Sequence, residues 1–89
     1  MSTHYLFDRQ PGEREEAFTA FRAYLDLGPK RSLAAVGRQL GKSKALMERW
    51  SSRWNWVARV EAYTNHLFRQ ADLEQQRELR RKIVTRMRP

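Results

Sequence analysis

Basic side chains concentrate in the middle third of this chain. Residues 28–54 hold seven basic residues and one acidic residue, Glu48, for a net charge of +6. Residues 1–27 hold three basic and five acidic residues, residues 55–89 hold eight and four, and the whole chain carries +8. Such a concentration of positive charge is the electrostatic footprint expected of a polyanion binder. The seven basic residues are Lys30, Arg31, Arg38, Lys42, Lys44, Arg49 and Arg53.

The pattern around these charges is typical of two short helices joined by a tight turn. Residues 33–40 and 44–52 both repeat apolar side chains at helical spacing, and Gly41 between them can close a turn in a left-handed conformation. Gly37 falls where the first helix would approach the second most closely, so a bulky side chain there would separate them. Ser43 is expected to cap the second helix. The segment therefore predicts a helix-turn-helix.

The facing surfaces of the two predicted helices are apolar. Leu46, Met47 and Trp50 share one stripe of the second helix and are expected to pack onto Val36 and Leu40 of the first. The opposite face of the second helix remains polar and basic. An ordinary helical hairpin whose charges are merely solvated is the alternative interpretation.

Lys42 departs from the usual pattern, because many helix-turn-helix proteins place an aliphatic residue directly after the turn glycine. Either the aliphatic stem of Lys42 lies over the core with its ammonium group at the surface, or the turn is a variant.

If this segment binds duplex DNA, the second helix is the natural reader, since its exposed N-terminal side chains can enter a major groove about 12 Å wide. Lys30, Arg31 and the helix amides beside Ser32 form a second expected phosphate contact. Sequence specificity is expected to be modest, because the face is poor in the Asn and Gln side chains that read adenine. The expected DNA contacts are Lys30, Arg31, Ser32, Lys42, Ser43, Lys44, Arg49 and Arg53.

The elements before the basic segment are expected to scaffold it. Residues 1–12 have no helical period and end in a Pro-Gly pair, so they predict a flexible N-terminal arm whose apolar side chains are still free to pack. A helix is expected from Glu13, with Phe18 and Phe21 contributing to an aromatic core, and the Gly-Pro pair after Leu27 ends it. Residues 13–54 thus predict one small DNA-binding domain.

Residues 55–89 predict one long helix that associates with copies of itself. No proline or glycine occurs between Asn55, the expected cap, and Pro89, so Trp56 to about Met87 can form a helix of roughly 45 Å. Its sparse apolar residues favour projection and self-packing over folding back, although their spacing is too irregular for a coiled coil and a frayed basic tail is the alternative. The expected oligomerisation residues are Val60, Tyr63, Leu67, Phe68 and Ile83.

Three tryptophans cluster at the junction between the predicted domain and the long helix. Trp50, Trp54 and Trp56 could form a platform on which single-stranded bases stack. A domain this small needs large side chains to close its core, so a core role is the favoured interpretation.

Composition argues against several function classes. There is no cysteine and there are only two histidines, so no disulfide, metal site or cofactor is expected. No nucleophile-base pair or glycine-rich phosphate loop suggests an enzyme, and no catalytic residue is expected. No apolar run approaches the roughly 20 residues that span a bilayer, and no secretion signal is recognisable, so we expect no membrane contact and a soluble, intracellular, cytoplasmic protein.

Residues 17–63 resemble the N-terminal helix-turn-helix segment of small terminase subunits and related phage DNA-binding proteins. The shared features are an aromatic helix ending in Leu27-Gly28, then Arg31 and Ser32, a Gly41-Lys42-Ser43 turn, and Trp50-Ser51-Ser52 before Trp54-Asn55-Trp56. The resemblance covers about half of the chain.

This resemblance implies a subunit that recognises viral genomic DNA for packaging, assembles into a ring and works with a large subunit carrying ATPase and nuclease activity, in an infected or lysogenic bacterial host. A dimeric helix-turn-helix transcription regulator of phage or prophage origin is the main alternative. A protein-interaction module, in which the long helix binds a partner, is a third. In each case the sequence predicts an all-α fold: three short helices in a helix-turn-helix domain, followed by a long C-terminal helix.

Overall fold

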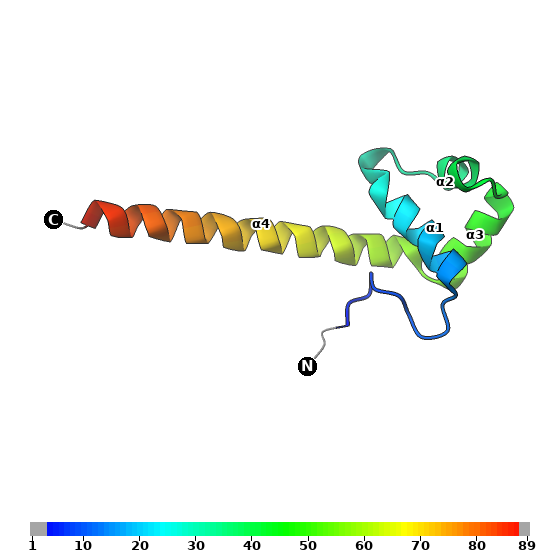
Figure 1. Ribbon diagram of the computed structural model, residues 1–89, viewed down its shortest axis with the longest axis horizontal. Coiled ribbons are helices and arrows are strands. Elements are labelled where there is room, and N and C mark those ends of the chain that lie inside the picture. Colours follow the sequence, from blue (N-terminus) through cyan, green and yellow to red (C-terminus); the bar gives the residue numbers. More distant parts are fainter. Residues whose placement is uncertain (1–3, 88–89) are drawn as a thin grey trace.

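The computed structural model describes residues 4–87, and these form an all-α fold. The predicted fold class is confirmed: three short α-helices and one short 3-10 helix precede the long helix. Figure 1 shows the order of the elements. They are α1 (Glu15–Asp26), the short 3-10 helix η1 (Gly28–Lys30), α2 (Leu33–Leu40), α3 (Lys44–Arg53) and α4 (Trp56–Met87).

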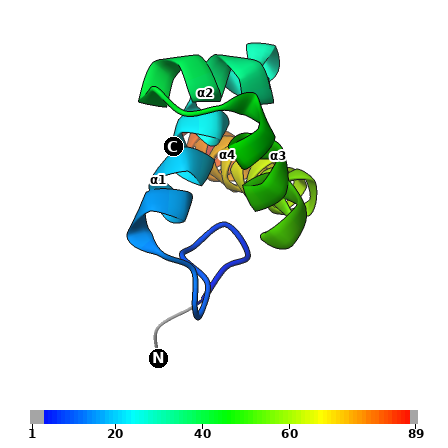
Figure 2. The same cartoon turned by 90° about the vertical axis from the view of Figure 1, so that its right-hand side faces the viewer.

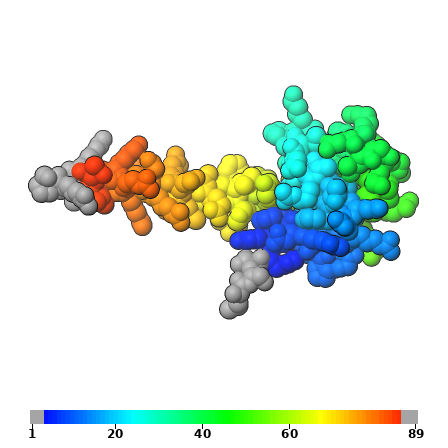
Figure 3. Space-filling view, viewed as in Figure 1, coloured from blue at the N-terminus to red at the C-terminus, as the bar shows by residue number. Residues whose placement is uncertain are grey.

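The molecule consists of a compact head, residues 4–66, and a projecting stalk, residues 67–87. The stalk is the distal part of α4 and stands clear of the other elements (Figures 1 and 3). Its projection raises the radius of gyration to 18.3 Å, compared with about 12 Å for a compact chain of this length. Among the described helices, none combines the length and apolar character needed to cross a membrane.

The centre of the head is a small core to which each of the four α-helices contributes. Phe21 of α1, Val36 of α2, Met47 of α3 and Trp56 of α4 are completely buried. The ring centroids of Phe21 and Trp56 lie 6.0 Å apart, and Tyr24 packs on the same indole at 5.2 Å. The core role expected for the tryptophans therefore holds fully for Trp56, while Trp50 and Trp54 are half-buried against this core.

Local signals set the starts of α2 and α3 and the turn between them as expected, whereas Asn55, the expected cap of α4, has a left-handed φ of 50°. The hydroxyls of Ser32 and Ser43 accept hydrogen bonds from the amides of Ala35 and Leu46, at 3.0 and 3.1 Å. Gly41 follows α2 with a φ of 68°, the left-handed conformation predicted for the turn. These contacts leave little freedom in the path from α2 to α3.

Residues 4–12, expected as a flexible arm, instead pack along the first turns of α4. Phe7 is buried, and its ring meets the edge of Tyr63 at 5.2 Å. Tyr5 stacks on Phe7 at 4.8 Å, and His66 of α4 lies 4.9 Å from Tyr5. The apolar side chains of this segment thus close one side of the head.

A buried ion pair between Glu13 and Arg59 ties this segment to the rest of the head. Their atoms Oε2 and Nη1 lie 2.8 Å apart, and both side chains are almost completely excluded from solvent. The Arg59 guanidinium also donates to the carbonyls of Leu6, Asp8 and Trp54. Both carboxylate oxygens of Glu13 accept from Arg59, so all three guanidinium nitrogens are used.

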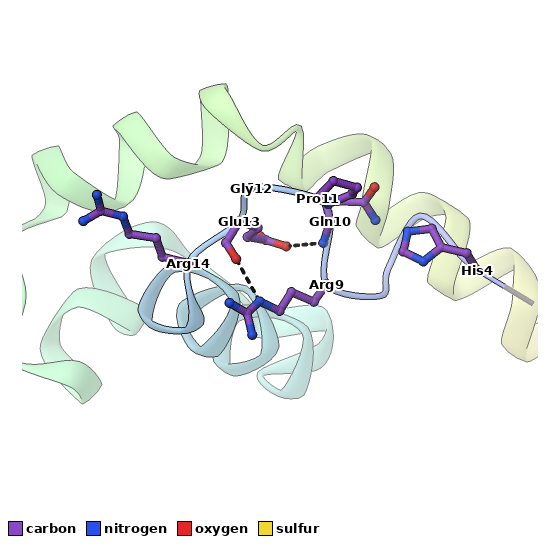
Figure 4. A pocket seen from close by; sticks show the side chains of 7 residues that line it. All are labelled: His4, Arg9, Gln10, Pro11, Gly12, Glu13 and Arg14. Carbon is purple, nitrogen blue, oxygen red and sulfur yellow. Dashed lines mark hydrogen bonds between the residues drawn. The ribbon is translucent and has the colours of Figure 1, made fainter. Parts of the chain in front are cut away.

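Glu13 was expected in the solvated first turn of helix one, and this expectation is wrong. The helix begins two residues later, at Glu15, and Glu13 is 2% exposed. Its carboxylate accepts from the amide of Gln10, and its carbonyl accepts from Nε of Arg9 (Figure 4). The side chain therefore organises the turn before α1 instead of facing water.

Candidate nucleic-acid interface

The helix-turn-helix geometry depends on a close approach at Gly37. A Cβ atom added there would lie 2.7 Å from the backbone oxygen of Lys42, too close for any side chain. The Lys42 amide donates to the Gly37 carbonyl at 2.8 Å, which fixes the turn against α2. The steric role expected for Gly37 is thus confirmed.

One side of α3 is open to solvent and predominantly basic. Met47 is buried and Leu46 and Trp50 are half-buried, as the predicted stripe requires. The opposite side is exposed, and Lys44 there approaches Glu48 to 3.8 Å in a solvated ion pair, which contributes little stability. We call this exposed side of α3 the reading face, and its residues are Ser43, Lys44, Ala45, Glu48, Arg49, Ser52 and Arg53.

Lys42 lies at the edge of the reading face with its stem against the core. The residue is half-buried, and its ammonium nitrogen sits 5.9 Å from the centre of the Trp50 ring. Of the two possibilities left by the sequence, the structure has the first: the stem covers aromatic surface and the charge reaches solvent.

Arg31 faces the end of α1 in this structure, although it was expected to contact phosphate. Its Nε and Nη2 donate to the carbonyls of Tyr24 and Leu25 at 3.3 and 3.4 Å. Its guanidinium carbon also lies 5.7 Å from the centre of the Tyr24 ring. These bonds satisfy carbonyls that the end of a helix leaves unpaired. Lys30 and Ser32 of the same expected contact are exposed, with the Ser32 hydroxyl engaged as the α2 cap.

α3 and the stalk lie at opposite ends of the molecule (Figure 1). α1, α2 and α4 all contact α3, which lies at the end remote from the C-terminus. Figure 2 looks onto that end, with α4 receding behind the head. A ligand on α3 would therefore not touch the stalk of the same chain.

The residues expected to mediate oligomerisation divide between head and stalk. Val60 and Tyr63 are half-buried and pack against the core of their own chain, so the expectation that they form a contact between chains is not supported by their placement. Leu67, Phe68 and Ile83 are 49%, 70% and 54% exposed. Only these three therefore remain open to another chain.

The sequence interpretation missed a regular spacing of exposed apolar residues along α4. Val57, Phe68 and Leu79 are spaced by 11 residues and are all more than half exposed. Eleven residues are close to three helical turns, so these side chains form one stripe nearly parallel to the axis. Leu73 and Val84, also 11 residues apart and about half exposed, form a second stripe. An 11-residue spacing does not match the seven-residue repeat of a coiled coil.

Comparison with family models, curated proteins and solved structures finds no match to this chain.

Proposed function

We propose that this chain binds duplex DNA through the reading face of α3 and assembles with copies of itself through the stalk. In this proposal it is a small-terminase-like subunit that recognises viral genomic DNA for packaging and works beside a large ATPase and nuclease subunit. The sequence resemblance over residues 17–63 supports the packaging role.

The observation that carries DNA binding is the exposed basic face of a firmly seated α3. Gly37 and the two serine caps determine the direction of the helix, and Lys44 and Arg49 extend from its first two turns into solvent. This is the arrangement in which the second helix of a helix-turn-helix enters the major groove. Neither side chain is needed by the core, so both remain available for phosphates and base edges.

The direct test removes these two charges. The double variant Lys44→Ala, Arg49→Ala should weaken duplex binding on the order of 10- to 100-fold at 0.1 M salt, because each lost phosphate contact reduces the salt slope by about 0.9. The matched control, Arg22→Ala with Arg69→Ala, removes two exposed charges elsewhere and should change affinity little. Fluorescence anisotropy with a labelled duplex measures both. Equal affinity of the double variant and the wild type would refute DNA binding through α3.

The two apolar stripes support assembly with more than one neighbour. Leu73 and Val84 each follow a member of the first stripe by five residues, which places the stripes about 140° apart around the helix axis. A single stripe would suit a symmetric pair of helices, whereas two separate stripes suit a helix packed between two others. This supports a ring over the dimeric regulator, because contacts between different surfaces of successive copies form a ring when their rotation closes, whereas a symmetric dimer uses one self-complementary surface.

Assembly is tested by placing a charge on the first stripe. Leu79→Asp should shift the mass measured by light scattering toward that of the 10.7 kDa monomer, because a carboxylate cannot be buried in an apolar contact without a large desolvation cost. Gln70→Asp adds the same charge on the side of the helix opposite Leu79 and should lower the mass less than Leu79→Asp does. A wild-type protein that stays monomeric at high concentration would refute the assembly.

A further inference from the structure

A groove of about 330 Å³ lies between the start of α1 and the end of α3. The half-buried indoles of Trp50 and Trp54 form part of its lining, and the exposed side chains of Arg14 and Arg53 stand at its rim. Glu16 is the one carboxylate among its lining residues. The groove is thus a basic, aromatic-lined depression large enough for a phosphodiester group.

Both arginines at the rim are free to bind an anion. Arg53 lies with its guanidinium carbon 5.3 Å from the centre of the Trp54 ring, a contact that restrains the side chain without occupying its N–H donors. Figure 4 shows the side chain of Arg14 extending away from the cluster formed by Arg9 and Glu13. Within residues 4–87, the ion pairs involve neither Arg14 nor Arg53.

The groove adjoins the reading face. Arg53 belongs to both, because it is exposed on the last turn of α3 and also lines the groove. A duplex whose major groove holds α3 presents one of its two backbone strands to each side of that helix. The groove lies on one of these sides, between the end of α3 and the start of α1.

We propose that this groove holds a phosphate of the DNA strand that flanks α3, with Arg14 and Arg53 as the donors. The inference rests on the proposed function and adds Arg14, outside the helix-turn-helix, to the DNA interface. The two guanidiniums supply planar, paired N–H donors suited to phosphate oxygens. The indoles of Trp50 and Trp54 provide an apolar wall that limits competing water around the bound group.

The test is the salt dependence of duplex binding by Arg14→Gln. One phosphate contact contributes about 0.9 to the slope of log affinity against log salt. Arg14→Gln should lower the slope by about this amount. Between 50 and 200 mM salt, the fold-loss of affinity of the variant should therefore be about 3.5 times smaller than the fold-loss of the wild type. Arg22→Gln, in the helix that Arg14 precedes, is the matched control and should keep the full slope.

A rescue variant separates phosphate binding from folding. The Arg14 side chain makes no capping hydrogen bond, so its replacement should not shorten α1. Arg14→Lys retains the charge and should restore most of the slope. If Arg14→Gln acted through a folding defect, restoring the charge alone would not restore the slope. Unchanged slopes in both Arg14→Gln and Arg22→Gln would overturn the inference.

The outcomes also distinguish this inference from the proposed function. If Lys44→Ala, Arg49→Ala abolishes binding while Arg14→Gln matches the wild type, the groove assignment fails and the DNA-binding proposal stands. If neither variant changes affinity, both fail. Tighter binding of a single-stranded oligonucleotide than of a duplex, with Arg14→Gln affecting only the single strand, would also overturn the inference, by indicating base stacking on the two indoles.

Discussion

The buried pair of Glu13 and Arg59 offers a quantitative test of what holds the head together. The variant Arg59→Met keeps an apolar stem of similar length but leaves Glu13 buried without its cation. It also removes donors from the carbonyls of Leu6, Asp8 and Trp54. Removing one partner of a buried pair costs about 3–5 kcal/mol. Contact with the Phe21 ring, whose centre is 3.9 Å from the guanidinium carbon, is lost as well.

This loss is a large part of the total stability of the chain. At about 0.05–0.15 kcal/mol per residue, 89 residues give roughly 4–13 kcal/mol for the free energy of unfolding. Glu13→Gln should cost less than Arg59→Met, because the amide oxygen of Gln and the three carbonyls still accept from Arg59. The double variant should cost about 1–3 kcal/mol less than the sum of the two, since neither charge is then left buried without its partner.

Urea titrations followed by tryptophan fluorescence and by circular dichroism, at one fixed protein concentration, measure all four proteins of this cycle. Trypsin provides a second measurement, because Arg59→Met should release the segment around Arg9 and speed cleavage there. A cost below about 1 kcal/mol for Arg59→Met, or costs that add within about 0.5 kcal/mol, would refute the argument that this pair anchors residues 4–12.

Three further predictions concern the turn and the reading face. Gly37→Ala should destabilise the head by about 1–3 kcal/mol in urea titrations, because the clash of the new Cβ with the backbone oxygen of Lys42 outweighs the gain in helix propensity. A stabilised variant would contradict this. Ser43→Ala should cost about 1 kcal/mol by loss of the cap, whereas the exposed Thr19→Ala should cost less than half of that; equal costs would show that the cap contributes nothing specific. Lys42→Met should leave the unfolding free energy within about 1 kcal/mol, because the stem is retained, while anisotropy detects weaker duplex binding; a large loss of stability would show that the charge itself holds the turn.

The features predicted correctly from the sequence are local ones. A cap such as Ser43 interacts with an amide three residues away, and the conformation of Gly41 is set by its lack of a side chain. The prediction that Met47 is buried was also local, because it depended on the spacing of apolar residues within one helix, which follows the helical turn. These signals correctly predicted the turn between α2 and α3 and the side of α3 that faces solvent.

The features that were missed depend on contacts between distant parts of the chain. Glu13 and Arg59 are 46 residues apart, and neither has neighbours that mark it as buried. Phe7 packs on Tyr63, 56 residues further along the chain, and the composition of residues 4–12 alone does not reveal this contact. Arg31 presents the same difficulty in the candidate site, because its carbonyl partners come from the end of α1 and are fixed only when η1 folds back. The 11-residue spacing of Val57, Phe68 and Leu79 is present in the sequence, but it differs from the seven-residue period of a coiled coil.

The most direct test of the central proposal, a DNA-reading head on a self-associating stalk, is sedimentation of the wild-type protein with and without a labelled duplex. The protein alone should sediment well above its monomer mass of 10.7 kDa. At 0.1 M salt the duplex should co-sediment with this assembly and dissociate from it as the salt concentration rises. A protein that sediments as a monomer at every concentration, beside a duplex that sediments alone at low salt, would contradict the proposal.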